Sequence, residues 1–88
     1  MMKITLSKDA KKALDSLDTK TAARIWEAFR KIPDGDIKPL TGVRGVFRLR
    51  VGSWRVIFSY TEIATDGGVE TVASIKRISP RGDAYKGV

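Results

Sequence analysis

Apolar and basic residues alternate along residues 47–58, FRLRVGSWRVIF, on both sides of a Gly-Ser pair. Strict alternation is typical of a half-buried β-strand, with one face on the core and the other in water. Gly52-Ser53 has the length of a two-residue hairpin loop, in which glycine supplies the positive φ that a primed turn needs. The pattern therefore predicts a hairpin with these cross-strand pairs: Val51 with Trp54, Arg50 with Arg55, Leu49 with Val56, Arg48 with Ile57 and Phe47 with Phe58.

The two faces of this hairpin differ in chemistry. One face carries the apolar side chains of Phe47, Leu49, Val51, Trp54, Val56 and Phe58, and the other carries Arg48, Arg50 and Arg55. Like charges directly opposite each other repel, so a cross-strand arginine pair is unfavourable in isolation. We therefore expect the three arginines to bind an anion, with phosphate as the first candidate.

The first half of the chain predicts one strand and two helices. Lys3–Leu6 is short, alternating and β-branched, and Ser7 has the hydroxyl of a helix N-cap. Asp18-Thr19 offers a second cap, and residues 33–36, Pro-Asp-Gly-Asp, end the second helix. Apolar residues recur with helical spacing in both stretches: Ala10, Ala13, Leu14 and Leu17, then Ala22, Ile25, Trp26, Phe29 and Ile32. Because Trp26 and Trp54 share the core-facing periodicity, we expect both in the core.

The second half predicts the sheet. Residues 37–44 contain Pro39 and Gly42 and are predicted to be a connection without a strand. Residues 59–64 continue the strand that follows the hairpin loop, residues 66–68 turn the chain, and residues 69–78 form a last strand. We predict a single α+β domain spanning residues 1–88, with the order β-α-α-β-β-β. In it, a two-helix hairpin packs on one face of a mostly antiparallel four-stranded sheet, and the arginines lie on the opposite face.

The amino-acid composition excludes several kinds of site and of catalytic group. The chain has no cysteine and no histidine, which excludes a disulfide framework, thiolate chemistry, a zinc site of the usual ligands and an imidazole base. It has no apolar run of membrane-spanning length and no secretory leader pattern, so we expect a cytoplasmic protein. The net charge is +7, of which residues 37–88 contribute +5. Such a basic domain indicates a nucleic acid or an acidic protein partner, or a charge that serves solubility alone.

Four parts of the sequence carry a resemblance to a known group of proteins: Leu40 with Gly42, residues 47–50 with 52–58, Lys76-Arg77-Ile78, and residues 81–85, RGDAY. Over essentially the whole chain, this pattern resembles the RelE/ParE superfamily of toxins from bacterial type II toxin–antitoxin systems. The superfamily divides into RelE-type toxins, which cleave RNA, and ParE-type toxins, which act on DNA gyrase. Either type implies a cognate acidic antitoxin, a partly disordered segment that folds over the toxin to give a hetero-oligomer.

The RelE-type resemblance implies an mRNA endoribonuclease that works at the ribosome and inhibits translation. In this reaction the 2′-hydroxyl attacks its own phosphodiester, and no metal or other cofactor is needed. Arginine suits the neutralisation of the phosphorane, because its planar fork stays charged and meets phosphate oxygens in a bidentate manner. The resemblance assigns the scissile phosphate to Arg55, and it assigns the role of substrate clamps to Arg48 and Arg50.

A second phosphate-binding arginine is implied at Arg77 or at Arg81, and the spacing to the tail leaves both open. Regular pairing of the last two strands places Lys76, and not Arg77, beside Ile57 on the arginine side, which makes Lys76 a predicted RNA contact. A β-bulge or the end of the strand would break the alternation and let either arginine reach the site.

Tyr85 matches a tail tyrosine that stacks on a base or moves a proton in RelE-type toxins. Without histidine, the general base would be Tyr85 or a shifted arginine or lysine, and none of these has an ordinary pKa near neutrality. Glu62 and Glu70 flank the far turn, where we expect them to be solvated. Two alternatives stay open: a ParE-like toxin that disables gyrase through the helical hairpin or the tail, and a non-catalytic nucleic-acid-binding module.

Overall fold

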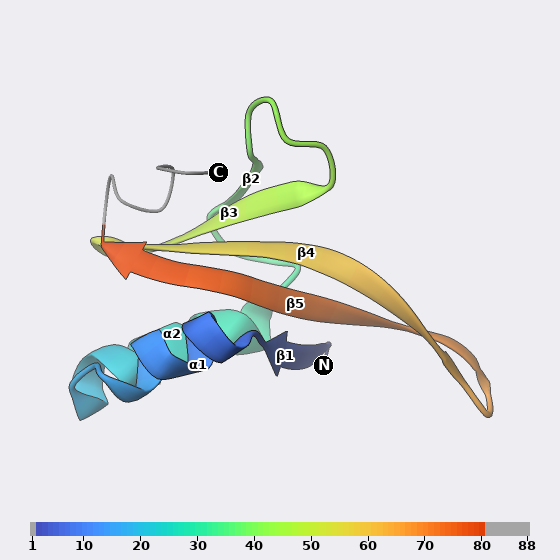
Figure 1. The fold of residues 1–88 in the computed structure, drawn as a ribbon, viewed down its shortest axis with the longest axis horizontal. Coiled ribbons are helices and arrows are strands. Elements are labelled where there is room, and N and C mark those ends of the chain that lie inside the picture. The colour runs from blue at the N-terminus through green and yellow to red at the C-terminus, as the bar shows by residue number, and fades with distance from the viewer. Residues whose placement is uncertain (1, 81–88) are drawn as a thin grey trace.

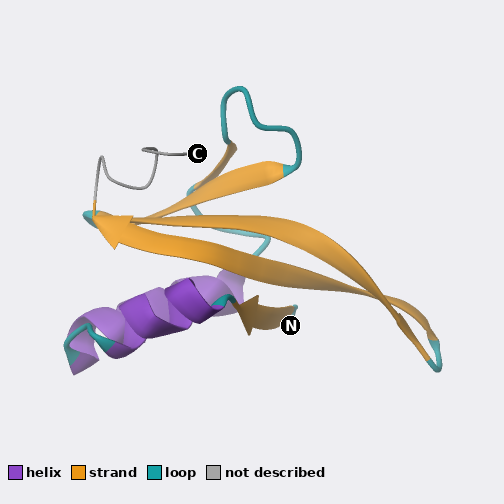
Figure 2. Cartoon of the chain, viewed as in Figure 1, coloured by secondary structure: helices purple, strands orange, loops and turns teal. Residues whose placement is uncertain are grey.

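The computed structural model of the protein describes residues 2–80, which form two helices and five strands. In chain order these are β1 (Lys3–Leu6), α1 (Lys8–Asp15), α2 (Thr19–Lys31), β2 (Ile37–Pro39), β3 (Val46–Val51), β4 (Trp54–Thr65) and β5 (Gly68–Pro80). The strands make one sheet in the order β1-β5-β4-β3-β2, in which β1 is parallel to β5 and the other neighbours are antiparallel. Both helices lie on one side of this sheet (Figures 1 and 2). The predicted α+β fold, with a helical hairpin on one face, is confirmed.

The prediction of four strands is wrong, because the expected connection at residues 37–44 contains β2. This strand pairs with β3 in the register Ile37 with Leu49, Lys38 with Arg48 and Pro39 with Phe47. A proline has no N–H to donate and is tolerated in an edge strand, where that N–H would face solvent, and β2 is an edge strand. Pro39 thus prevented the prediction of this strand from the sequence, although it is compatible with the strand itself.

Side-chain caps begin both helices, as predicted. The Ser7 hydroxyl accepts a hydrogen bond from the Ala10 N–H at 3.0 Å at the start of α1. At the start of α2, the Asp18 carboxylate accepts from the Thr21 N–H at 3.2 Å and from the Thr21 hydroxyl at 2.6 Å. Each cap satisfies an N–H that the helix itself leaves without a partner. The caps therefore set where each apolar stripe begins.

The core lies between the helices and the sheet, with α1 against β5 and α2 against β3. Its buried members come from both helices, the residue after α2 and three strands: Ala10, Leu14, Ile25, Phe29, Ile32, Leu49, Val56, Phe58, Ala73, Ile75 and Ile78. Burial of this apolar surface is the main favourable contribution to folding. The stripes predicted from helical spacing and from strand alternation therefore meet, as expected for this layer arrangement.

The two tryptophans have different environments. Trp54 packs against the core cluster, as predicted. The prediction for Trp26 is wrong, because 38% of its surface is exposed. Ile25 and Phe29 occupy the centre of the buried stripe of α2, which leaves Trp26 at the edge of that stripe, with its ring edge-on to Phe29 at a centroid distance of 5.4 Å. Helical spacing identified the apolar stripe but not its width.

The hairpin at residues 52–53 has the predicted register at all five pairs. Gly52 has a φ of +60°, the left-handed conformation that glycine adopts without steric cost. β4 and β5 then continue past the helices as a long twisted ribbon (Figure 1). Residues 61–71, at the far end of this ribbon, are all exposed. We call residues 61–71 the arm.

Candidate functional site

Basic side chains gather on the side of the sheet that faces away from the helices. Arg50 and Arg55 are directly opposite each other across β3 and β4, and Arg48 is opposite Ile57 on the same face. This arrangement follows from strand alternation, because Leu49 and Val56 on the other face are buried in the core. We call these three arginines, together with Arg77 of β5, the arginine face; the position of Arg77 is described below.

Arg55 is the buried member of this face, with 6% of its surface exposed. Its Nη1 donates a hydrogen bond to the carbonyl of Trp54 at 3.3 Å. Within residues 2–80, no carboxylate forms an ion pair with it. A buried guanidinium without a carboxylate partner is costly, and an anion that reaches it is bound in a medium of low dielectric, where attraction is strong.

Arg48 and Arg50 are placed by the segment before β2. Arg48 Nη2 lies 3.8 Å from Asp36 Oδ1, a long ion pair whose carboxylate side chain is 48% exposed. The main-chain N–H of Arg50 donates to the Asp36 carbonyl at 3.0 Å, while its side chain is exposed. A partly solvated pair of this length is weak. Asp36 therefore neutralises Arg48 only in part, and 14% of the Arg48 side-chain surface remains exposed to an anion.

The predicted partner of Ile57 is wrong: Arg77, and not Lys76, is opposite this residue. The β4–β5 register is regular from the far turn to Phe58 with Ile75, and then shifts by one residue. Lys76 is the extra residue of this β-bulge. A bulge makes two residues of one strand face one residue of the other, and here it aligns Arg77 with the arginine face. A bulge was one of two routes expected to bring an arginine to the site, but its position at Lys76 was not predicted.

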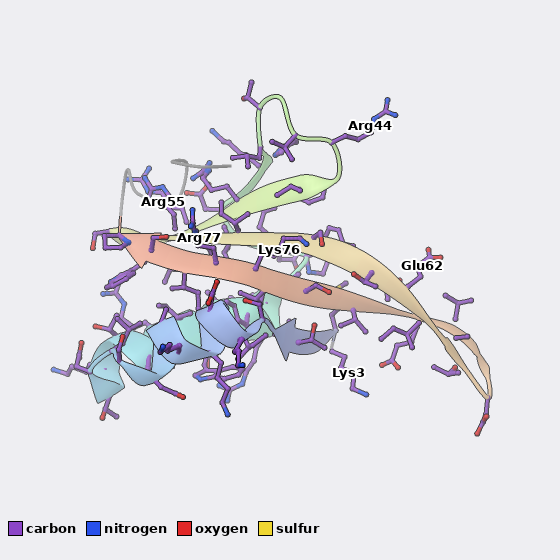
Figure 3. The ribbon with its side chains drawn as sticks, viewed as in Figure 1. Lys3, Arg44, Arg55, Glu62, Lys76 and Arg77 are labelled. Atoms are coloured by element: carbon purple, nitrogen blue, oxygen red, sulfur yellow. The ribbon has the colours of Figure 1, made fainter. Side chains whose placement is uncertain are left out.

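Two hydrogen bonds from Ser7 accompany the bulge. The Ser7 N–H donates to the Ile75 carbonyl at 2.9 Å, and its hydroxyl donates to the Lys76 carbonyl at 2.9 Å. The junction of β1 and α1 thus supplies donors where the β4–β5 ladder is irregular. Figure 3 shows Arg55 and Arg77 close together at one end of the sheet, with Lys76 farther along β5.

Sequence reasoning missed one cation of this surface, Lys38. It pairs with Arg48 in the β2–β3 register and is exposed. Because the strand that holds it was not predicted, nothing in the sequence analysis brought it near the arginines. The alternation of Ile37, which faces Leu49, with Lys38 was the available signal, and it is too short to be recognised beside a proline. With Lys38, cations span four adjacent strands.

Arg81 and Tyr85 lie outside the described residues, so their roles stay predictions. Among the described residues, two side chains have a shifted pKa. Hydrogen bonds from Thr21 lower the pKa of Asp18, and burial raises the pKa of Tyr60, whose ring packs against Phe47 and Phe58. Neither belongs to the arginine face. The described part of the chain therefore supplies this face with cations for charge neutralisation.

Residues 2–80 contain neither a group of metal ligands nor a membrane-spanning helix. No three histidine, cysteine or acidic side chains in this range are grouped so as to hold a metal ion. No helix in it has the length and apolar character needed to cross a membrane.

Known proteins offer a structural match without a sequence match. No protein-family profile matches the chain, and neither does any curated protein sequence. A chain in the crystal structure of the RelB-RelE antitoxin-toxin complex from Methanococcus jannaschii has a similar fold, with a TM-score of 0.63. The alignment covers 91% of this chain and 93% of that chain, at 18% sequence identity. The shared architecture thus extends over nearly the whole length of both chains.

Proposed function

We propose that this protein is the toxin of a type II toxin–antitoxin system and a RelE-like endoribonuclease that cleaves mRNA at the ribosome. The observation that carries the proposal is Arg55, a buried guanidinium without a described carboxylate partner, on a helix-free sheet face beside further arginines. The fold shared with a chain of a RelB-RelE complex supports it. So does the sequence resemblance, which rests on the same hairpin.

In the proposed reaction, the ribose 2′-oxygen attacks the adjacent phosphorus and the bond from phosphorus to the 5′-oxygen breaks. The products are a 2′,3′-cyclic phosphate and a 5′-hydroxyl, with one proton leaving the 2′-oxygen and one reaching the 5′-oxygen. Arg55 and Arg77 neutralise the charge that develops on the phosphorane, which is a contribution made chiefly in the transition state. Arg48, Arg50, Lys38 and Lys76 hold the flanking phosphates and set the alignment.

The proton transfers are assigned to residues of the tail. Tyr85 stacks on a base or serves as proton acceptor, and Arg81 is the second candidate beside Arg77 for the phosphate. Both assignments rest on the resemblance. Arginine in this role supplies charge and geometry, whereas acceptance of the 2′-proton needs a group of lowered pKa. The ribosome can supply part of the alignment, which reduces what the chain itself must provide.

The proposed partners follow from charge. A chain with a net charge of +7 attracts both mRNA and an acidic antitoxin, and an antitoxin segment that covers the arginine face would block RNA. We place the protein in the cytoplasm, where its proposed target is found.

The test is translation of a short mRNA in a reconstituted system, with cleavage sites mapped by primer extension. Wild type should cut at defined codon positions, and Arg55→Ala should not. Arg30→Ala is the matched control, because Arg30 is exposed on α2 and paired with Glu27. If wild type and Arg55→Ala cut equally, or if neither cuts, the assignment of Arg55 as the phosphate ligand of a nuclease fails.

The second candidate is a ParE-like toxin that disables gyrase by binding. The exposed ring of Trp26 favours it, because it lies in a hollow of the helical hairpin with Leu17 and Ala22, where a protein could dock. Gyrase-dependent DNA breaks in cells that express wild type, and their loss in Trp26→Ala, would support this function over RNA cleavage. Expression without toxicity would favour a nucleic-acid-binding module instead.

A further inference from the structure

The arm differs in charge from the rest of the protein. Its charged residues are Glu62, Asp66 and Glu70, and no lysine or arginine occurs between Arg55 and Lys76. The arm therefore carries −3, while the rest of the chain carries +10. Charge of one sign on an exposed element attracts a surface of the opposite sign.

Within residues 2–80, no other element pairs with the arm or buries it. β3 pairs with β4 only as far as Ser59, and β1 pairs with β5 only as far as Val72, so beyond these residues the ribbon has two strands. Ile63 and Val69 expose 43% and 69% of their surfaces there. A two-stranded ribbon with free edges is marginally stable alone and is a ready template for association.

The arm cannot reach the arginine face of its own molecule. Glu62 and Arg55 belong to one continuous strand and are separated by about 23 Å at about 3.3 Å per residue. Figure 3 shows Glu62 far along the ribbon from Arg55, Arg77 and Lys76. The acidic and basic surfaces can therefore meet only between molecules.

We propose that the arm docks on the arginine face of a second copy of this chain. Two copies related by a twofold axis would each place an acidic arm on the other's basic face, which gives two identical contacts and closes the assembly as a dimer. Arg50 on the arginine face and Lys76 beside Arg77 in β5 are exposed cations, so their charge is complementary to that of the arm. The apolar side chains of Ile63 and Val69 would be removed from water in the same interface.

One consequence rests on the proposed function: the dimer would cover the surface that binds RNA, so RNA and the second copy would compete. The dimer itself can be tested without RNA. Its failure and the failure of the nuclease assignment are therefore separate results.

The first test is sedimentation velocity of the full chain over a range of concentrations, at about 50 and about 500 mM NaCl. We expect a monomer–dimer equilibrium that weakens at least about tenfold at the higher salt, because the contact is made between exposed charges. Glu62→Lys with Glu70→Lys should abolish the dimer at both salt concentrations. Glu27→Lys with Asp34→Lys makes the same change in net charge away from the arm and should leave most of the dimer.

The second test exchanges the charges. A copy with Glu62→Lys and Glu70→Lys has a basic arm, and a copy with Arg50→Glu and Lys76→Glu has a far less basic face. Each should be monomeric alone, and their mixture should form a heterodimer in which each arm again meets a face of more favourable charge. Circular dichroism establishes that each variant is folded.

The proposal is overturned if wild type is monomeric at every concentration at low salt. It is also overturned if the arm variant dimerises like wild type, or if the control variant dissociates equally. A heterodimer that fails to form between two folded variants would show that the arm and the arginine face do not contact each other. A complex of the arm with an unrelated basic protein, and none with a second copy, would assign the arm to that partner instead.

Discussion

The Ser7 hydroxyl and the Lys76 carbonyl, 69 residues apart in sequence, are joined by a hydrogen bond of 2.9 Å. The same hydroxyl accepts from the Ala10 N–H, so one side chain both begins α1 and satisfies the carbonyl of the bulged residue. This links the first turn of a helix to the position where β5 changes register and brings Arg77 onto the arginine face.

Ser7→Ala should therefore lower stability by about 1–2 kcal/mol, the upper part of the range for loss of an N-cap. For a domain of this size, this corresponds to a fall in Tm of roughly 4–16 °C, measured by thermal unfolding. Ser7→Thr keeps a hydroxyl and should retain most of the stability. Equal Tm values for Ser7→Ala and wild type would show that the two hydrogen bonds contribute nothing net.

Arg55→Met should separate stability from activity. Arg55 is buried and has no carboxylate partner among residues 2–80, so an apolar side chain of similar length should leave the free energy of unfolding within about 1 kcal/mol of wild type or raise it. Cleavage of mRNA should fall about 100-fold to 1,000-fold, as expected for loss of a group that stabilises developing charge. The measurements are urea unfolding and single-turnover cleavage.

Arg55→Lys completes this comparison. Lysine keeps the charge but loses the bidentate fork, so its activity should lie between those of wild type and Arg55→Met. A strongly destabilised Arg55→Met protein would contradict the prediction, because it would mean that Arg55 is held by partners that stabilise the fold.

Lys38 and Arg50 should each account for about one phosphate contact with single-stranded RNA. Removal of either by alanine should make the dependence of log K on log salt shallower by about 0.7, the value expected for one contact with a single strand. Fluorescence anisotropy with a short labelled RNA over a salt series measures this slope. Lys11→Ala changes an exposed lysine of α1 and should leave the slope unchanged. If the slope does not change in Lys38→Ala, β2 does not form part of the RNA surface.

The cap of α2 should make part of the stability depend on pH. The pKa of Asp18 is lowered in the folded protein by hydrogen bonds from Thr21, so this contribution is present above the ordinary pKa of 3.8 and is lost as the pH falls through the lowered value. Asp18→Ala should be less stable than wild type at neutral pH, and the two should converge as the pH falls below 3.8 and through the lowered pKa of Asp18. Urea unfolding over the pH range measures the difference. A stability difference that stays constant down to pH 2 would show that the stabilisation by the cap does not depend on the charge of Asp18.

Sequence reasoning reached the features that depend on local patterns. The hairpin register follows from period-two alternation around Gly52, and the helix starts follow from Ser7 and Asp18, so each signal lies within a few residues of its effect. These features include the opposition of Arg50 and Arg55. The fold class followed because alternating strands and a pair of amphipathic helices must bury their apolar faces against each other.

The features that sequence reasoning missed depend on distant contacts. The bulge at Lys76 occurs beside hydrogen-bond donors of Ser7, and no sequence pattern within β5 predicts its position. β2 depends on pairing with β3, and its three residues include a proline, which is read as a breaker when the neighbouring strand is unknown. The exposure of Trp26 likewise depends on how α2 sits on the sheet. Each error therefore concerns tertiary context that overrides a local preference.

This sheet contains two cross-strand pairs of like charge, Lys38 with Arg48 and Arg50 with Arg55. Four positive groups held opposite one another raise the free energy of the unliganded fold, and a polyanion that lies across them removes this repulsion. Relief of this repulsion contributes both to the affinity for the anion and to the thermal stability of the complex. Occupancy of the surface by any anion should therefore stabilise the fold by mass action. In a cell, the unoccupied protein would be the form most readily unfolded and degraded.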